Sequence, residues 1–175
     1  MAKRGYTRDT IRGGASDWDV SRPFSSYLRL LSTLLVHPIR FFGLLPKVPD
    51  VRAPALFLAF SGLPAAVVWF FFAGLYPALV ALVLPLPLSV LLAGPYHLAA
   101  SGGRYGFGVT WRVVAYPLGF ALPFLAVPLV RWAAVAWAAA LLMPLGVVKA
   151  QEVPVWRAVV CALVVALLAV AAYPA

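Results

Sequence analysis

The feature that most constrains the fold of this chain is a run of 51 consecutive residues, 53–103, without a single Asp, Glu, Lys or Arg. Soluble domains carry charged residues at about one position in four, whereas this chain is 11% charged and 64% hydrophobic. A water-soluble fold cannot bury so much apolar surface. Because a bilayer core about 30 Å thick needs about 20 apolar residues per helix, the run predicts two membrane-spanning helices.

Further apolar stretches follow, and together they predict an all-α membrane protein with a five-transmembrane-helix bundle over residues 54–174. The expected spans are about 54–73, 77–98, 112–128, 131–149 and 155–173. Only "VPLVR" can form the turn between the third and fourth spans. A single helix through both would be about 54 Å long at 1.5 Å per residue, which exceeds the thickness of a bilayer. We therefore expect a tight hairpin at Pro128.

The basic residues give an independent test of this topology. With five spans, the N-terminal segment and two basic loops share one side, which then holds thirteen of the fourteen Lys and Arg residues, and Arg131 alone lies on the other. A four-span arrangement, in which 113–148 forms one span plus a re-entrant piece, would move Lys149 and Arg157 across the membrane. The positive-inside rule thus favours five spans, with the N-terminus cytoplasmic and the C-terminus outside.

The first fifty residues differ in character from the rest. Residues 1–20 are polar and glycine-rich, which predicts a flexible cytosolic tail. From 21 to 50 we expect amphipathic interfacial helices, the first with Ser21 as N-cap and Pro23 in its first turn. Its apolar face is formed by Phe24, Tyr27, Leu28, Leu31, Leu34 and Leu35. A short one-sided helix is typical of the membrane interface, and packing on the protein's own cytosolic face would produce the same pattern.

Several classes of function are disfavoured by what the apolar segments lack. No Asp or Glu falls inside a predicted span, although ion-coupled transporters usually carry an ionisable residue at mid-membrane depth. Ser61 and Ser89 lie within spans but outside any G-x-S-x-G pattern, and His37 and His97 have no partner at metal-ligand spacing. The net charge of +9 suits anionic lipid better than nucleic acid. We expect no enzyme, no cofactor and no nucleic-acid partner.

The segments also follow a recognisable order. An amphipathic "LLSTLLVHPIRFFGLLP" precedes two spans, the loop "SGGRYGFGVTWRVVAYP", a close-packed third and fourth span, "GVVKAQEVPVWRA" and a last span. This order resembles the Yip family of five-span membrane proteins, whose eukaryotic members associate with Rab-type GTPases. The resemblance covers roughly residues 25–174 and implies a fold and a topology. The Asp-Leu-Tyr-Gly-Pro segment of eukaryotic members has no counterpart in "LLPKVPDVRAPAL", which weighs against a GTPase partner, and the compact loops are typical of a prokaryotic plasma-membrane protein.

The loop "SGGRYGFG" is the first candidate for contact with a lipid headgroup or a partner. Its glycines could form an anion nest while Arg104 holds a phosphate, or they could simply make a tight turn. Glu152 could tie the two cytosolic loops together through an ion pair with Arg104, Arg112 or Arg157, or it could gate a path between spans. The candidate residues are Arg29, Arg40, Phe41, Phe42, Gly102, Gly103, Arg104, Arg112, Lys149 and Glu152.

These features predict a non-enzymatic integral membrane protein that acts from its basic cytosolic face. That face would organise either the phospholipid membrane, by binding anionic headgroups, or a protein partner. The alternative is a lipid translocator or small-molecule permeation protein that uses a groove between proline-kinked helices. A polar stripe across one face of the first three spans would support the alternative, and the sequence offers only Ser61, Ser89 and Tyr116 for it.

The fourth span carries a pattern of small residues four positions apart. Ala134 and Ala138, or Ala136 and Ala140, could form the seam. Such a seam allows close helix packing, either within the chain or in a homo-oligomer.

Overall fold

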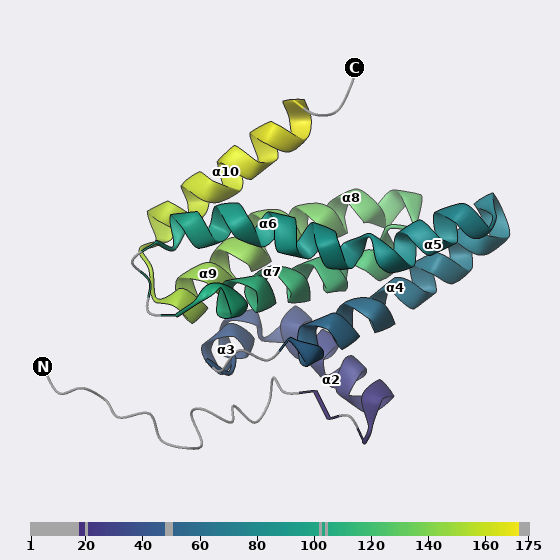
Figure 1. Cartoon of the computed structure of the whole chain (residues 1–175), viewed down its shortest axis with the longest axis horizontal. Helices are drawn as coiled ribbons and strands as arrows, with labels where there is room; N and C mark the ends of the chain where they lie inside the picture. Colours follow the sequence, from purple (N-terminus) through teal and green to yellow (C-terminus); the bar gives the residue numbers. More distant parts are fainter. Residues whose placement is uncertain (1–17, 20, 48–50, 102, 104, 172–175) are drawn as a thin grey trace, which may run out of the picture.

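The computed structural model describes residues 18–19, 21–47, 51–101, 103 and 105–171 of the 175-residue chain, with side chains to residue 167. Every regular element in this part of the chain is helical (Figure 1), which confirms the predicted all-α class. Of the tail expected at 1–20, only Trp18 and Asp19 are among the described residues. The Trp18 indole packs on the Phe60 ring, with 5.2 Å between the centroids.

The helices fall into three groups along the chain. Two short N-terminal helices come first, α2 (Pro23–Val36) and α3 (Pro38–Gly43). The first half of the bundle consists of α4 (Arg52–Ala73), α5 (Leu75–Val83) and α6 (Pro85–Ala99). The second half consists of α7 (Phe107–Ala121), the 3-10 turn η1 (Leu122–Phe124), α8 (Pro128–Ala136), the π-helical η2 (Trp137–Leu142), α9 (Met143–Gln151) and α10 (Val155–Ala171).

Three helical stretches in the described chain are long and apolar enough to cross a membrane, namely Arg52–Ala73, Leu75–Ala99 and Pro128–Gln151. They correspond to the first, second and fourth expected spans. The helix expected at 112–128 starts earlier, at Phe107, and gives way to the 3-10 turn at Leu122. The last expected span is α10, whose 17 described residues make it shorter than the other three stretches.

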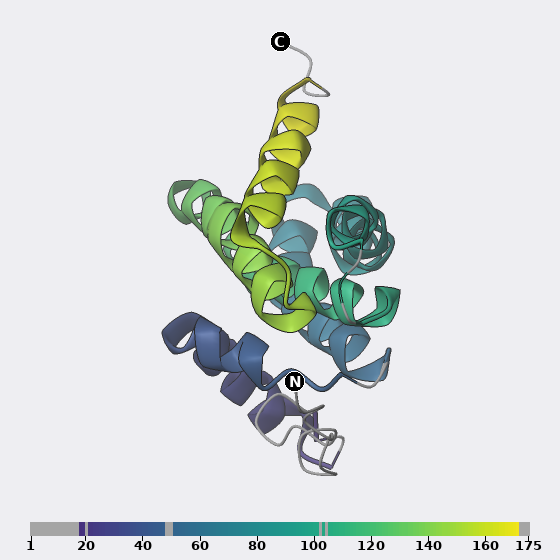
Figure 2. The same cartoon turned by 90° about the vertical axis from the view of Figure 1, so that its left-hand side faces the viewer.

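The most enclosed helix of the bundle is α7. Twelve of its fifteen residues are buried, because α4, α6 and α9 pack around it (Figures 1 and 2). A close approach at Gly119 brings α4 against α7: a Cβ at this position would lie 2.6 Å from the Phe57 ring and 3.3 Å from the Ser61 hydroxyl. Since neighbouring helices cover α7, this helix can hold polar side chains that a lipid-facing helix could not.

The α4–α5 hairpin extends beyond the other helices at one end of the molecule (Figure 1). Gly74 makes its turn with a φ of 90°, a backbone conformation that glycine adopts without steric cost. Aromatic side chains are highly exposed around the turn, at Phe71, Phe72 and Tyr76.

The expected hairpin between the third and fourth spans is present. The chain turns after η1, and α8 begins at Pro128. Of the two small-residue seams considered, the pair Ala134 and Ala138 is buried, and it packs against Ala121 of α7. The seam therefore serves packing within the chain. Directly after it, Trp137–Leu142 forms a π-helical segment, a rare geometry that shifts the helical register.

The first N-terminal helix divides its predicted apolar stripe between two surroundings. Tyr27 and Leu34 are buried against the bundle, together with Leu30, which the prediction did not include. Of the other members of the stripe, Leu31 is half-buried and packs against the core. The remaining three are exposed: Phe24 65%, Leu28 47% and Leu35 51%. Both α2 and α3 lie beside the bundle, where α3 packs on α9 and α2 reaches α7 (Figure 2).

The cap expected at Ser21 is not formed, because α2 begins at Pro23 after Arg22. Asp19 organises this turn instead. Its carboxylate accepts hydrogen bonds from the hydroxyl of Ser21 at 2.7 Å and from the backbone N–H of Ser21 at 2.9 Å. These bonds, the side-chain one first, hold the pKa of Asp19 below its usual 3.8.

Candidate functional site

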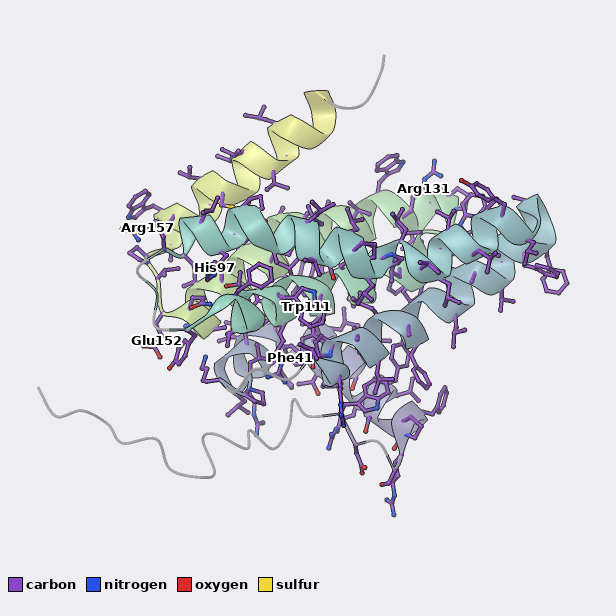
Figure 3. The ribbon with its side chains drawn as sticks, viewed as in Figure 1. Phe41, His97, Trp111, Arg131, Glu152 and Arg157 are labelled. Carbon is purple, nitrogen blue, oxygen red and sulfur yellow. The ribbon has the colours of Figure 1, made fainter. Side chains whose placement is uncertain are left out.

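Three connections that are far apart in the sequence meet at one end of the bundle. They are the α3–α4, α6–α7 and α9–α10 connections, and Figure 3 shows His97, Glu152 and Arg157 together at this end, with Arg131 at the other. We use the name polar junction for the side chains that join these connections: Lys47, His97, Tyr105, Thr110, Arg112 and Gln151.

The centre of the polar junction is Gln151, whose side chain is fully buried. Its amide Nε2 donates to the hydroxyl of Thr110 at 2.8 Å, and its Oε1 accepts from the backbone N–H of Tyr105 at 3.2 Å. The Thr110 hydroxyl also shares a hydrogen bond with Nδ1 of His97, at 3.1 Å. The last residue of α9 is thus connected to the start of α7 and, through Thr110, to α6.

Lys47 joins the N-terminal segment to the same place. Its Nζ donates to the carbonyl of Ala150 at 2.9 Å and lies 4.8 Å from the centre of the Tyr105 ring. A cation is favourable here because the C-terminal end of a helix, in this case α9, carries partial negative charge. Burial lowers the pKa of Lys47 below its usual 10.5, and the negative charge of Glu152 opposes that shift.

The candidate Arg112 belongs to the interior of the molecule. Its side chain is fully buried, and its Nη1 donates to the carbonyl of Pro46 at 2.9 Å. Its position after the glycine-rich loop predicts a place at the membrane surface. Because α7 already begins at Phe107, Arg112 lies more than one turn inside the helix, and we correct its role from headgroup contact to a link between α7 and the α3–α4 connection.

Phe41 and Phe42 require the same correction, since they are 1% and 0% exposed. The Phe41 ring meets Tyr116 edge to face, with centroids 5.2 Å apart. Phe42 packs on α9 at Gly146, where a Cβ would lie 2.8 Å from its ring. These two aromatic side chains attach α3 to the bundle and do not reach a headgroup or a partner.

In the glycine-rich loop, Gly102 and Arg104 lie outside the described residues. Gly103 makes a close approach: a Cβ there would lie 2.8 Å from the carbonyl oxygen of Ala100 and 3.0 Å from Oε1 of Gln151. The glycine therefore lets the loop pack on the polar junction.

The remaining candidates, Arg29, Arg40, Lys149 and Glu152, are exposed. Glu152 follows α9 in a left-handed conformation with φ 56°, and its Oε1 accepts a hydrogen bond of 3.4 Å from the hydroxyl of Tyr105. Arg157, one of the arginines considered as a partner for Glu152, donates instead to the carbonyl of Ser101 at 2.9 Å. The two loops are tied together by Arg157, Tyr105 and Gln151.

The candidate set does not include Gln151, Thr110 or Lys47, which carry most of the described hydrogen bonds of the polar junction. Their one sequence signal is a polar residue beside or inside an apolar helix. That signal does not say which polar side chains turn inward, because the answer depends on how α7 is covered.

Apolar clefts open on the outer surface of the described part of the bundle, among them the following three. One, of about 420 Å3, lies between α4, α5–α6 and α7, and another, of about 460 Å3, lies between α8–α9 and α10. The third, of about 410 Å3, lies between α6 and α10 and has Ser101 and Arg157 in its lining. Among the described residues, no group of three or more His, Cys, Asp or Glu could hold a metal ion.

In comparisons with known proteins, no family model, no curated protein and no solved structure matches the chain.

Proposed function

We propose that the chain is a non-enzymatic, five-span integral membrane protein of the Yip type. Its N-terminal helices lie in the cytosolic membrane interface, and its basic side gathers anionic membrane or a protein partner. The order of segments that resembles the Yip family supports this proposal. So does the one-sided distribution of Lys and Arg, which orients membrane proteins with the basic side inside.

The observation that carries the proposal is the divided apolar stripe of α2. One flank, with Tyr27, Leu30 and Leu34, packs on the protein. The neighbouring flank, with Phe24 and Leu28, is apolar and exposed. Beside a bundle of apolar helices, such a helix can pack one flank on the protein and insert the other into the membrane. An interfacial helix buries its apolar side at the boundary between headgroups and acyl chains.

Exposed cations accompany the apolar flank. Arg22, Arg29 and Arg40 are exposed on or beside α2 and α3, and Lys149 is exposed at the end of α9. Each Lys or Arg held near an anionic membrane surface contributes about 1 kcal/mol of attraction. Several of them together would hold the basic side against an anionic leaflet, or recruit a second anionic surface to it.

The alternative function, a translocation path, is supported less well. Ser61, Ser89 and Tyr116 are all buried, and Ser89 accepts a hydrogen bond from the indole of Trp111 at 2.8 Å. The polar stripe expected for a headgroup path is therefore inside the bundle, whereas the clefts that open outward are lined mainly by apolar side chains.

The interfacial position of α2 is tested by a nitroxide label at Leu35→Cys, in a Cys161→Ala background, after reconstitution into vesicles. We expect the label to collide with oxygen, which concentrates in lipid, more often than with a water-soluble nickel chelate. The same label at Ser25→Cys, on the polar side of α2, is the control and should show the opposite preference. Equal accessibility at the two sites would contradict an interfacial helix.

The gathering of membrane is tested with proteoliposomes and a second population of phosphatidylcholine vesicles, made with or without phosphatidylglycerol. We expect capture only of the vesicles that contain phosphatidylglycerol, weakened by salt and by the triple change of Arg22, Arg29 and Arg40 to Gln. Arg131→Gln, at the other end of the bundle, should leave capture unchanged. If the triple variant captures vesicles as well as the wild-type protein, the basic side does not recruit membrane.

A further inference from the structure

The groove between α6 and α10 differs from the other two clefts in its charge. Ser101, Trp156 and Arg157 form one end of it, and the walls below are apolar, with Leu98, Val160 and Val164. The residues that line the other two clefts include no charged side chain. The volume of about 410 Å3 falls within the roughly 300–1,000 Å3 typical of ligand pockets.

Arg157 is held in place at the mouth of this groove. Its Nη1 donates to the carbonyl of Ser101 at 2.9 Å, which joins the start of α10 to the end of α6. The guanidinium also lies over the Trp156 ring, 5.4 Å from its centre. A guanidinium has five N–H donors in a fixed plane, so the bond to Ser101 positions the group and leaves it donors for an anion.

The surroundings of the mouth indicate its depth in a membrane. The Trp156 side chain is 62% exposed, and exposed tryptophans of membrane proteins concentrate at headgroup level. Arg157 lies at the same end of the molecule as Glu152 and His97 (Figure 3), the end that the five-span topology assigns to the cytoplasm. From Arg157 to Val164 the groove follows α10 for about 10 Å at 1.5 Å per residue, from headgroup level toward the hydrocarbon.

A ligand that fits both parts must have an anionic head and an apolar chain. Arginine matches phosphate well, because its planar donors can bind two oxygens at once. The exposed walls at Leu98, Val160 and Val164, which are 74%, 50% and 47% exposed, would be covered by hydrocarbon.

We propose that the α6–α10 groove binds one anionic phospholipid of the basic-side leaflet, with its phosphate on Arg157 and an acyl chain along Val160 and Val164. The site rests on the membrane embedding proposed above and deepens it by naming the lipid class and the residues that select it.

Native mass spectrometry of the detergent-solubilised full-length chain, titrated with dioleoyl phosphatidylglycerol or dioleoyl phosphatidylcholine, tests the site. We expect the wild-type protein to retain one phosphatidylglycerol in preference to phosphatidylcholine. Arg157→Gln should lower the affinity for phosphatidylglycerol about tenfold, because it removes a charge-assisted contact. Arg131→Gln is the matched control, since Arg131 also lies over a tryptophan, Trp132, at 5.2 Å, and it should bind as the wild-type protein does.

A second variant tests the chain-binding part without touching the charge. Val164→Phe fills the groove at an exposed position and should lower binding of phosphatidylglycerol several-fold, whereas Val159→Phe, which lies on the α10 side facing another cleft, should not. Thermal unfolding in detergent without added lipid shows whether each variant is folded. Because Val164 is exposed, this variant remains informative even if Arg157→Gln unfolds.

The proposal is overturned if Arg157→Gln, when folded, and Val164→Phe both bind phosphatidylglycerol like the wild-type protein. It is also overturned if the two controls lose binding equally, because that result describes a non-specific lipid belt. Extraction of membranes with alkaline carbonate separates this failure from that of the proposed function. If the chain stays in the membrane but shows no selective lipid binding, only the lipid site is contradicted. If the chain is released, the proposed membrane embedding is contradicted.

Discussion

At the scale of single residues, the polar junction shows how one buried amide can join two connections. Gln151, at the end of α9, hydrogen-bonds both to Thr110 and to the backbone of Tyr105. A buried polar group left without its partner costs about 1–3 kcal/mol. Removing this amide takes a buried hydrogen-bond partner away from both the Thr110 hydroxyl and the Tyr105 N–H.

We expect Gln151→Ala to lower the free energy of unfolding by about 2 kcal/mol, the middle of the range for a lost buried partner. Denaturant unfolding of the protein in detergent micelles would measure it. A double-mutant cycle with Thr110→Val should give a coupling energy of at least about 0.5 kcal/mol. Ser32→Ala, on the exposed side of α2, should change stability little, and additivity of the Gln151 and Thr110 changes would contradict the network.

Lys47 gives the polar junction a pH dependence. Burial lowers its pKa in the folded protein below 10.5, so the unfolded chain binds the proton more tightly. Between the lowered pKa and 10.5, stability attributable to Lys47 therefore rises with pH, and below that window it is constant. Comparing thermal unfolding of the wild-type protein and of Lys47→Met across alkaline pH should show the wild-type protein gaining relative stability.

Lys149→Met is the control for this measurement, because Lys149 is an exposed lysine on the same helix end. This variant keeps Lys47, so it should gain stability relative to Lys47→Met across the same pH range, as the wild-type protein does. A wild-type protein that loses stability relative to Lys47→Met as pH rises would show that Lys47 is stabilised in its charged form.

At the scale of elements, sequence pattern predicted a helix where α2 lies but could not divide its apolar stripe. Periodicity reports that one side of a helix is apolar, and it does not distinguish protein from lipid on that side. Tyr27 and Phe24 belong to the same predicted stripe, yet Tyr27 packs on Phe57 with ring centroids 5.4 Å apart, while Phe24 is exposed. For the same reason, the sequence pattern predicted Phe41 and Phe42 as binding residues, although both are buried in the protein.

The fourth expected span shows a second limit of pattern. The spacing of small residues predicts two alanine pairs equally well as the packing seam. Only the path of α8 past α7 shows that Ala134 and Ala138 form it. The π-helical segment that begins at Trp137 changes the register between α8 and α9, so α-helical spacing cannot be extended across it.

We expect Ala138→Leu to destabilise the protein by about 1–3 kcal/mol, the usual cost of inserting methylene groups into a packed interior. Ala138 is 2% exposed and packs with Ala121, so there is little room for the larger side chain. Ala133→Leu, at an exposed position of α8, is the matched control and should be nearly neutral. Thermal unfolding in detergent measures both. Equal melting temperatures of the two variants would show that the helices accommodate leucine at position 138 without loss of stability.

At the scale of the whole molecule, the central prediction is the number of membrane crossings. The α7 helix is short and almost wholly enclosed, so its own length and composition do not decide whether it crosses. The turn after η1 decides it, because five spans place that turn outside, whereas a re-entrant α7 would return it to the cytoplasmic side.

We expect single cysteines at Leu129 and Phe72, introduced in a Cys161→Ala background, to react with an impermeant maleimide added to intact cells. A cysteine at Ser101 should react only after permeabilisation. Leu129 and Phe72 are 94% and 85% exposed, so burial would not prevent labelling. Labelling of Leu129 from the cytoplasmic side would replace five spans by a re-entrant arrangement.

The sequence by itself determined the helical class, the positions of most helices and the apolar stretches that are long enough to cross a membrane. These properties follow from hydrophobicity and length, which are sums over neighbouring residues and need no tertiary contact. Only the tertiary structure decided which side chains face inward: it buried Arg112 and Gln151, enclosed Phe41 and placed Arg157 at the mouth of an apolar groove. Burial depends on which helix covers which, and that is settled by contacts between segments far apart in the chain.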